Sequence, residues 1–136
     1  TQASLVHVLC SGHEYFPRAA DCVLHFAPLD FDMSSTEIWG GLLNGARVVV
    51  APPGRADPLV LGELIEERRV TYITPPNGVF GELVRAALPQ LGGLRLIAAG
   101  ADVMAPEAAR AVREAHPSVT LYNGYGPPEA TAESRS

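Results

Sequence analysis

The sequence has no lysine, because all 10 of its basic residues are arginine, and many phosphate chemistries depend on a lysine. Its two cysteines, Cys10 and Cys22, are too few and too unpatterned for a disulfide framework or a zinc site, so a reducing cytoplasm is expected. No apolar run approaches the roughly 20 residues of a membrane span, and nothing resembles a signal peptide. With 15 acidic residues and no basic stripe, nucleic acid is a poor candidate partner.

What the chain does have is enough apolar material for one domain. It is 136 residues long and 47% hydrophobic, so it can bury a core and disorder is not expected. Both ends look cut, since Thr1 stands where an initiator methionine would be and the chain stops in polar AESRS. We therefore expect a piece of a longer protein.

Five short stretches have strand character, and helical patterns lie between them. The strands are predicted at 22–26, 47–51, 70–74, 94–98 and 119–122. Ser34 and Glu37 match a capping box, followed by an apolar helical face that ends at Asn44-Gly45. The members of that face are Ile38, Trp39, Leu42 and Leu43.

Three further helices complete the pattern. Asp57 and Pro58 are a cap and a first-turn proline, and the stripe behind them consists of Val60, Leu61, Leu64 and Ile65. A weaker helix is predicted at 78–88 and a clear one at 106–116, whose inward residues are Ala108, Val112 and Ala115.

This strict alternation of strand and helix predicts an α/β fold with a mostly parallel sheet flanked by helices. In such sheets ligands bind outside the carboxyl ends of the strands. The segments there are FDMSSTE (31–37), TPPNG (74–78), AAGAD (98–102) and NGYGPPE (123–129). Each is rich in Gly, Pro, Asp, Ser or Asn, and the four could border one crevice.

Each segment taken alone has a structural and a functional interpretation. Asp32 could bind an ammonium group in an apolar pocket or could cap the next helix. The small residues at 98–101 would suit a flat aromatic ligand or mere packing. In NGYGPPE, Tyr125 can stack on a base and Glu129 can hold Mg²⁺, or the stretch is only a Gly-Pro turn.

Other reactive side chains do not form a recognisable site. The histidines at 7, 13, 25 and 116 have no shared spacing and look ordinary, with His116-Pro117 ending a helix. Ser34 and Ser35 lack a nucleophile-elbow context, and nothing supports a cysteine nucleophile.

Taken together, two motifs resemble an amino-acid adenylation domain of a nonribosomal peptide synthetase, in the adenylate-forming, AMP-binding superfamily. FDMSSTEIWGGLLNGARVVV is similar to the family's segment around its FDxS signature, and NGYGPPEAT is similar to its N-x-Y-G-P-T-E signature. The likeness spans nearly the whole chain. It implies that residues 1–136 are part of the large amino-terminal subdomain, without the upstream phosphate loop or the small carboxyl-terminal subdomain.

The resemblance also implies an activity and roles for particular residues. The activity is ATP- and Mg²⁺-dependent activation of an amino acid as aminoacyl-AMP, then transfer to the phosphopantetheine thiol of a carrier protein. Carrier and condensation domains of the same synthetase are the implied partners. Asp32 would pair with the α-ammonium group and Glu129 with Mg²⁺. The implied nucleotide contacts are Gly100, Ala101, Asn123, Gly124, Tyr125 and Gly126.

Side-chain selectivity in the family comes from scattered pocket residues. Besides Asp32, these would be Met33, Thr36, Thr74, Ile97, Ala99, Gly124, Ala132 and Glu133. The alignment around Thr74 could slip by one, which would make Ile73 the lining residue. Most of the set is small or apolar and favours an aliphatic substrate, whereas Glu133 would favour a basic one.

Two departures from the family pattern bear on catalysis. The threonine that contacts the α-phosphate in the family is Pro128 here, which offers no hydroxyl and no backbone donor. The family's catalytic lysine is absent, so we expect this chain alone to be inactive.

Two alternatives remain open at the level of sequence. An acyl-CoA or aryl-acid ligase of the same superfamily generally lacks the aspartate of the FDxS segment, so Asp32 favours the amino-acid branch. A non-catalytic remnant of the fold would explain Pro128 and the abrupt ends.

Overall fold

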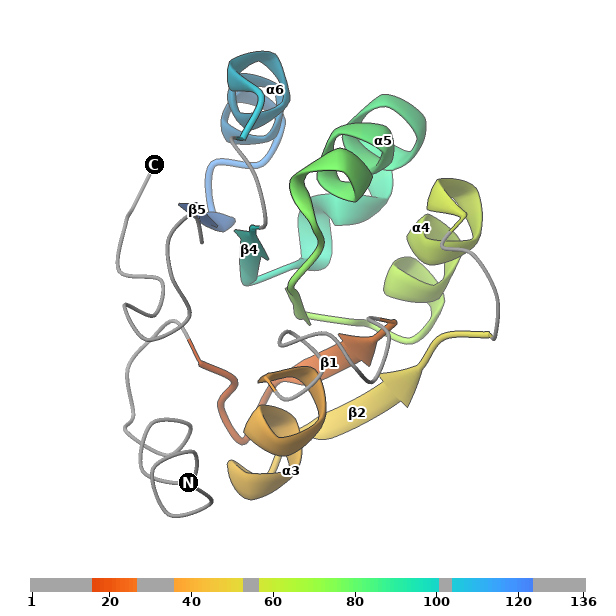
Figure 1. The fold of residues 1–136 in the computed structure, drawn as a ribbon, viewed down its shortest axis with the longest axis vertical. Coiled ribbons are helices and arrows are strands. Elements are labelled where there is room, and N and C mark those ends of the chain that lie inside the picture. The colour runs from red at the N-terminus through yellow and green to blue at the C-terminus, as the bar shows by residue number, and fades with distance from the viewer. Residues whose placement is uncertain (1–15, 27–35, 53–56, 101–103, 124–136) are drawn as a thin grey trace.

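Five parallel strands form one sheet in the computed structural model, which describes residues 16–26, 36–52, 57–100 and 104–123 (Figure 1). The strands are β1 (Cys22–His25), β2 (Arg47–Val50), β3 (Tyr72–Ile73), β4 (Leu96–Ala99) and β5 (Thr120–Asn123). Their order across the sheet is β2-β1-β3-β4-β5, and every neighbouring pair is parallel. The predicted parallel α/β sheet is confirmed, although β3 has only two of its five predicted residues.

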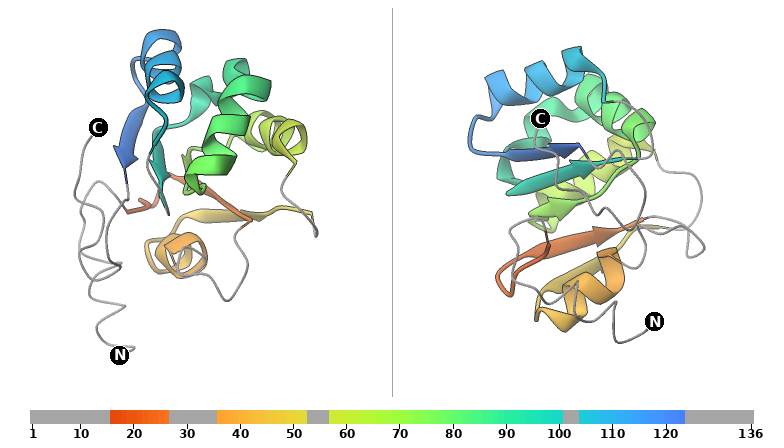
Figure 2. Two further views of the ribbon diagram at one scale, coloured as in Figure 1. Left: turned by 45° about the horizontal axis from the view of Figure 1, so that its top comes forward. Right: turned by 60° about the vertical axis from the view of Figure 1, so that its left-hand side comes forward.

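Helices connect successive strands and cover both faces of the sheet. The π-helical turn η1 (Thr36–Gly40) and the short α3 (Gly41–Leu43) follow β1, and α4 (Pro58–Glu67) follows β2. Next come α5 (Asn77–Ala87) with the 3₁₀ segment η2 (Leu88–Gly93), and α6 (Pro106–Ala115). Figures 1 and 2 show α4, α5 and α6 on one side of the sheet and α3 on the other.

Local signals explain several helix ends. The Asp57 carboxylate accepts a hydrogen bond from the Leu59 N–H (3.0 Å) and Pro58 opens α4, as predicted. Gly45 follows α3 with a φ of 79°, a conformation that glycine adopts without strain. In α6, Ala108 and Val112 are buried as predicted, but Ala115 is exposed and its prediction as an inward residue is wrong. Ala115 is the last residue of α6, and Ala109 is buried instead.

The core is divided between the two faces of the sheet by the alternation of strand side chains. Leu24, Ile73 and Ile97 belong to the large cluster that includes α4, α5 and α6 residues. Val23, Tyr72 and Leu96 belong to a smaller cluster on the other face, where α3 lies. A Cβ atom on Gly41 would lie 2.8 Å from Val48 Cγ2, so glycine lets α3 approach that face closely.

The helix after β1 does not pack its predicted apolar face against the sheet. Its apolar residues Trp39, Leu42 and Leu43 are exposed, Trp39 by half of its surface. The buried positions are instead Glu37, Gly40 and Gly41. Hydrophobic burial by those three apolar side chains therefore contributes little to holding this helix on the sheet.

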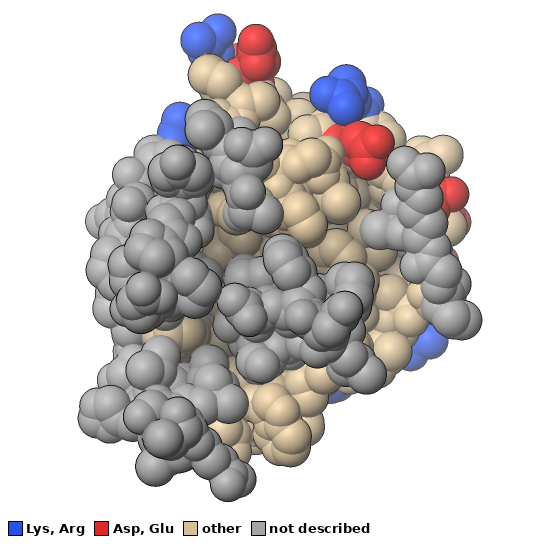
Figure 3. Space-filling view, in the orientation of Figure 1, with Lys and Arg blue, Asp and Glu red and all other residues tan. Residues whose placement is uncertain are grey.

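The face of the molecule shown in Figure 3 presents few charged side chains among the described residues, and they are of both signs. In the view of Figure 3 the blue and red side chains lie next to one another near the upper and right-hand margins. Within the described ranges, every helix is too short or too polar to traverse a bilayer.

Candidate functional site at the carboxyl ends of the strands

The carboxyl ends of β1, β3, β4 and β5 lie at one edge of the sheet because the strands are parallel. Thr36 opens η1 and Asn123 closes β5 at this edge, and the backbone of both is described. The other predicted residues that reach it are Thr74, Ile97, Ala99 and Gly100. The remaining predicted residues lie outside the described part of the chain and stay predictions: Asp32, Met33, Ala101, Gly124, Tyr125, Gly126, Glu129, Ala132 and Glu133.

The loops after β3 and β4 are joined through Gly100. The Gly100 N–H donates to the Pro75 carbonyl (3.1 Å), and the Asn77 N–H donates to the Gly100 carbonyl (2.8 Å). Gly100 also forms a parallel bridge with Pro76. Since the loop after β3 uses both backbone groups of Gly100, what this residue offers a ligand is van der Waals contact with a small, bare surface.

Thr74 and Ile73 point to different sides of the sheet. Ile73 lies directly opposite Ile97 in the ladder, and both belong to the same core cluster as Ala99. Thr74 follows Ile73, and its hydroxyl donates to Glu37 Oε2 (3.2 Å) on η1, across the other face. The structure thus groups Ile73, and not Thr74, with Ile97 and Ala99.

A buried carboxylate at this edge is a feature that the sequence reasoning missed. Glu37 is 0% exposed, and its Oε1 lies 2.7 Å from His25 Nδ1 and accepts the Phe26 N–H at 3.1 Å. An ionised carboxylate can only accept, so His25 Nδ1 is the donor of this contact when Glu37 is ionised. From the sequence, Glu37 is interpreted as a capping-box residue and His25 as an ordinary histidine. The one sequence feature that could have indicated the burial of Glu37 is the pair Gly40-Gly41, whose small size lets this side of the helix approach the sheet.

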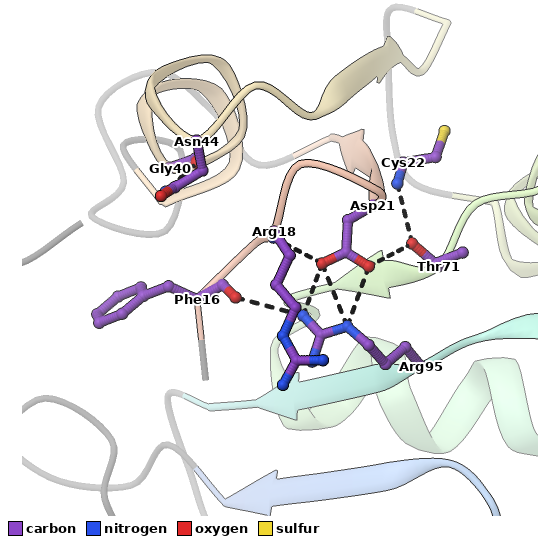
Figure 4. A network of polar contacts seen from close by, with 8 residues as sticks. All are labelled: Phe16, Arg18, Asp21, Cys22, Gly40, Asn44, Thr71 and Arg95. Carbon is purple, nitrogen blue, oxygen red and sulfur yellow. Dashed lines mark hydrogen bonds and ion pairs between the residues drawn. The ribbon is translucent and has the colours of Figure 1, made fainter. Parts of the chain in front are cut away.

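A second buried carboxylate lies at the opposite edge, before the strands begin. Asp21 Oδ2 lies 2.6 Å from Arg95 Nη2 and accepts the Arg18 N–H, while Asp21 Oδ1 accepts the Thr71 hydroxyl (Figure 4). Burial alone would raise the pKa of Asp21, but the hydrogen bonds from Arg95, Arg18 and Thr71 outweigh it and hold the pKa below its ordinary value. This cluster is remote from the predicted site residues and joins the starts of β1, β3 and β4.

Neither metal binding nor thiol chemistry is supported within the described ranges. Among these residues no group of three or more His, Cys, Asp or Glu side chains could hold a metal ion, and the predicted ligand Glu129 lies outside them. Burial raises the pKa of the Cys22 thiol despite the nearby Arg47 guanidinium, so the nucleophilic thiolate is disfavoured.

Comparison with known proteins identifies the class. The family model of AMP-binding enzymes matches residues 1–134, so the chain belongs to the AMP-binding enzyme family. The resemblance to nonribosomal peptide synthetase adenylation domains is confirmed by the relatives that follow.

Among the relatives is a linear gramicidin synthase protein from Brevibacillus parabrevis, which is 39% identical over 112 residues, or 82% of this chain and 1% of that protein. Among solved structures, holo-PA1221, a nonribosomal peptide synthetase protein with adenylation and PCP domains, is 36% identical with a TM-score of 0.83, covering 95% of this chain and 23% of that one. The NpsA amino-terminal subdomain from Klebsiella oxytoca, bound to 3-hydroxyanthranilyl-AMSN, is 30% identical with a TM-score of 0.76, over 85% of this chain and 30% of that one. The chain thus spans a small part of each relative.

Proposed function

We propose that this chain is part of an adenylation domain that activates the carboxylate of an amino acid. A carboxylate oxygen attacks the α-phosphorus of ATP, the bond to the β-phosphate oxygen breaks, and pyrophosphate leaves as aminoacyl-AMP forms. The thiol of a carrier-bound phosphopantetheine then takes the aminoacyl group and AMP leaves. The observation that carries the proposal is the family match over residues 1–134. The structure neighbour with adenylation and PCP domains supports a carrier domain as partner.

The proposed roles follow the residues that match the family motifs. Asp32 pairs with the substrate's α-ammonium group, and Asn123 and the backbone at Gly124 contact adenine. Tyr125 stacks on the base, and Glu129 holds Mg²⁺, an ion that prefers carboxylate oxygens. Because both backbone groups of Gly100 are engaged, we assign it a role as a close-packed floor between the adenine and substrate ends.

The proposed substrate is a small or medium aliphatic amino acid. Ile73, Ile97 and Ala99 share one face of the sheet and end at the same edge, which supports Ile73 as the lining residue in place of Thr74. These side chains are apolar and offer no hydrogen-bonding group to a polar substrate. Glu133 is the exception, and a basic substrate would follow if its carboxylate faces the pocket.

ATP–pyrophosphate exchange by the full-length protein that carries this segment tests the proposal. We expect exchange that depends on an aliphatic or basic amino acid, and Asp32→Ala to weaken the apparent amino-acid affinity by about a hundredfold, since a buried ion pair loses one partner. A strong preference for an acidic amino acid would contradict the assigned substrate. The 136-residue chain alone, which has no lysine, should show no exchange.

An aryl-acid ligase is the second candidate, and one observation favours it. The similar NpsA subdomain was solved with anthranilyl- and hydroxybenzoyl-AMSN compounds. An aryl acid has no α-ammonium group, so in that case Asp32→Ala would leave the substrate affinity unchanged.

If full-length protein bound neither ATP nor Mg²⁺ in a calorimetric titration, the chain would be a non-catalytic remnant of the fold.

A further inference from the structure

The Glu37 carboxylate is unusual in being fully buried at the edge of the sheet where the proposed substrate site lies. Removing a carboxylate from water is costly unless several donors replace the lost hydration. Among the described residues, the His25 ring, the Phe26 N–H and the Thr74 hydroxyl lie within hydrogen-bond distance of it. The carboxylate is thus satisfied within the protein.

These donors come from two strands that are neighbours in the sheet. His25 ends β1 and Phe26 follows it, while Thr74 follows the end of β3. Glu37 itself lies on η1, one residue after Thr36. One side chain therefore connects the carboxyl ends of β1 and β3 to the first turn of the helix that borders the proposed site.

Apolar burial by the described residues of this helix is limited. Trp39, Leu42 and Leu43 are exposed, Ile38 is half-buried, and the buried Gly41 contributes only its backbone to the contact with Val48. Apolar packing is also tolerant of small rotations, whereas three hydrogen bonds to one carboxylate define an orientation. The first turn is π-helical, and the buried Glu37 lies in it next to Thr36.

We propose that Glu37 is a positioning residue for the amino-acid end of the proposed site. By binding the ends of β1 and β3, it holds the backbone of Thr36 and the segment after β3 at a fixed distance from each other. Glu37 does not touch the nucleotide in this proposal, so its loss should affect amino-acid binding more than ATP binding. This inference rests on the proposed function.

The test is ATP–pyrophosphate exchange by the full-length protein with the substitution Glu37→Gln, compared with the unmodified protein. A glutamine keeps the shape but loses the charge and one of the two acceptor oxygens. We expect the KM for the amino acid to rise about tenfold, the KM for ATP to change by less than about twofold, and kcat to change little, because misplaced binding groups weaken the contact with the substrate they position.

Asp21→Asn is the matched control, because Asp21 is another buried acidic residue and lies at the opposite edge of the sheet. It should lower the melting temperature while leaving both KM values unchanged. If Glu37→Gln behaved in the same way, or raised both KM values equally, Glu37 would be a purely structural residue and the inference would be wrong. Absence of amino-acid-dependent exchange in the unmodified protein would instead overturn the proposed function itself.

A second pair of variants covers the case in which Glu37→Gln does not fold. His25→Leu removes only the 2.7 Å contact to Glu37, and His25→Asn restores a donor near the place of Nδ1. The inference expects a raised amino-acid KM in His25→Leu and its recovery in His25→Asn. An unchanged KM in His25→Leu would contradict it.

Discussion

One carboxylate is buried at the edge of the sheet where the strands begin and another at the edge where they end. The two carboxylates have different partners. Asp21, before β1, is held by the Arg95 guanidinium, the Arg18 N–H and the Thr71 hydroxyl (Figure 4). Glu37, past the end of β1, is held by a histidine ring, a backbone N–H and the Thr74 hydroxyl. Each carboxylate thus accepts a hydrogen bond from a threonine that flanks β3. Thr71 precedes the strand and Thr74 follows it.

These partners and positions fit a structural role for the Asp21 cluster and the proposed positioning role for Glu37. The Asp21 cluster joins the starts of β1, β3 and β4 through hydrogen bonds and one ion pair, at the end of the strands away from the predicted site residues. The Glu37 cluster connects a helix turn to strand ends at the edge where ligands bind in parallel sheets.

The most damaging substitution should be Asp21→Ala, through a loss of stability. It leaves Arg95, which is 24% exposed, without its carboxylate, and removing one partner of a buried ion pair costs about 3 kcal/mol. Urea denaturation of the full-length protein should show this loss for the unit that contains the segment. The amino-acid and ATP KM values of the folded protein should remain unchanged. A loss below about 1 kcal/mol would show that the pair is no stronger than a surface ion pair.

The sequence predicts the strands and helices better than it predicts the two carboxylate clusters. Strand and helix positions follow local periodicity, and the Asp57-Pro58 start of α4 follows a local capping rule, so these are predicted correctly. Neither carboxylate cluster has a local signature, because Asp21 meets Arg95 across 74 residues and Glu37 meets Thr74 across 37. Only the completed sheet brings these residues together.

The orientation of the helix after β1 could not be predicted for a different reason. Periodicity places Trp39, Leu42 and Leu43 on one side of a helix, as observed, but it cannot say which side meets the sheet. The side that meets the sheet carries Gly41, which permits the close approach to Val48, and Glu37, which is hydrogen-bonded to His25, Phe26 and Thr74. In the same way, the choice between Ile73 and Thr74 requires the pairing of Ile73 with Ile97, which no alignment of motifs contains.

Low pH should lower the stability of the fold by an intermediate amount, in part through protonation of Asp21. Its interactions depress the pKa of the Asp21 carboxyl in the folded state, so the carboxylate form favours folding. This contribution is fully present above the pKa of the unfolded chain and is lost as the pH falls through the lower folded pKa.

The melting temperature measured from about pH 6 down to about pH 3 should therefore fall less steeply in Asp21→Asn than in the unmodified protein. The variant has no carboxyl group to protonate at this position. Identical slopes in the two proteins would mean that Asp21 does not contribute to the acid sensitivity.

The weakest effects should come from the two threonines, Thr71→Val and Thr74→Val, which replace a hydroxyl by a methyl group of similar shape. Thr71 both donates to Asp21 and accepts the Cys22 N–H, so its loss should cost about 1–2 kcal/mol of stability with no change in KM. Thr74 donates to Glu37, and its loss should cost about 1 kcal/mol. Because this second bond lies at the proposed site, Thr74→Val should also raise the amino-acid KM slightly. Denaturation midpoints and exchange kinetics measured on the same two samples separate the edges: a KM change in Thr71→Val, or none in Thr74→Val, would remove the functional distinction between them.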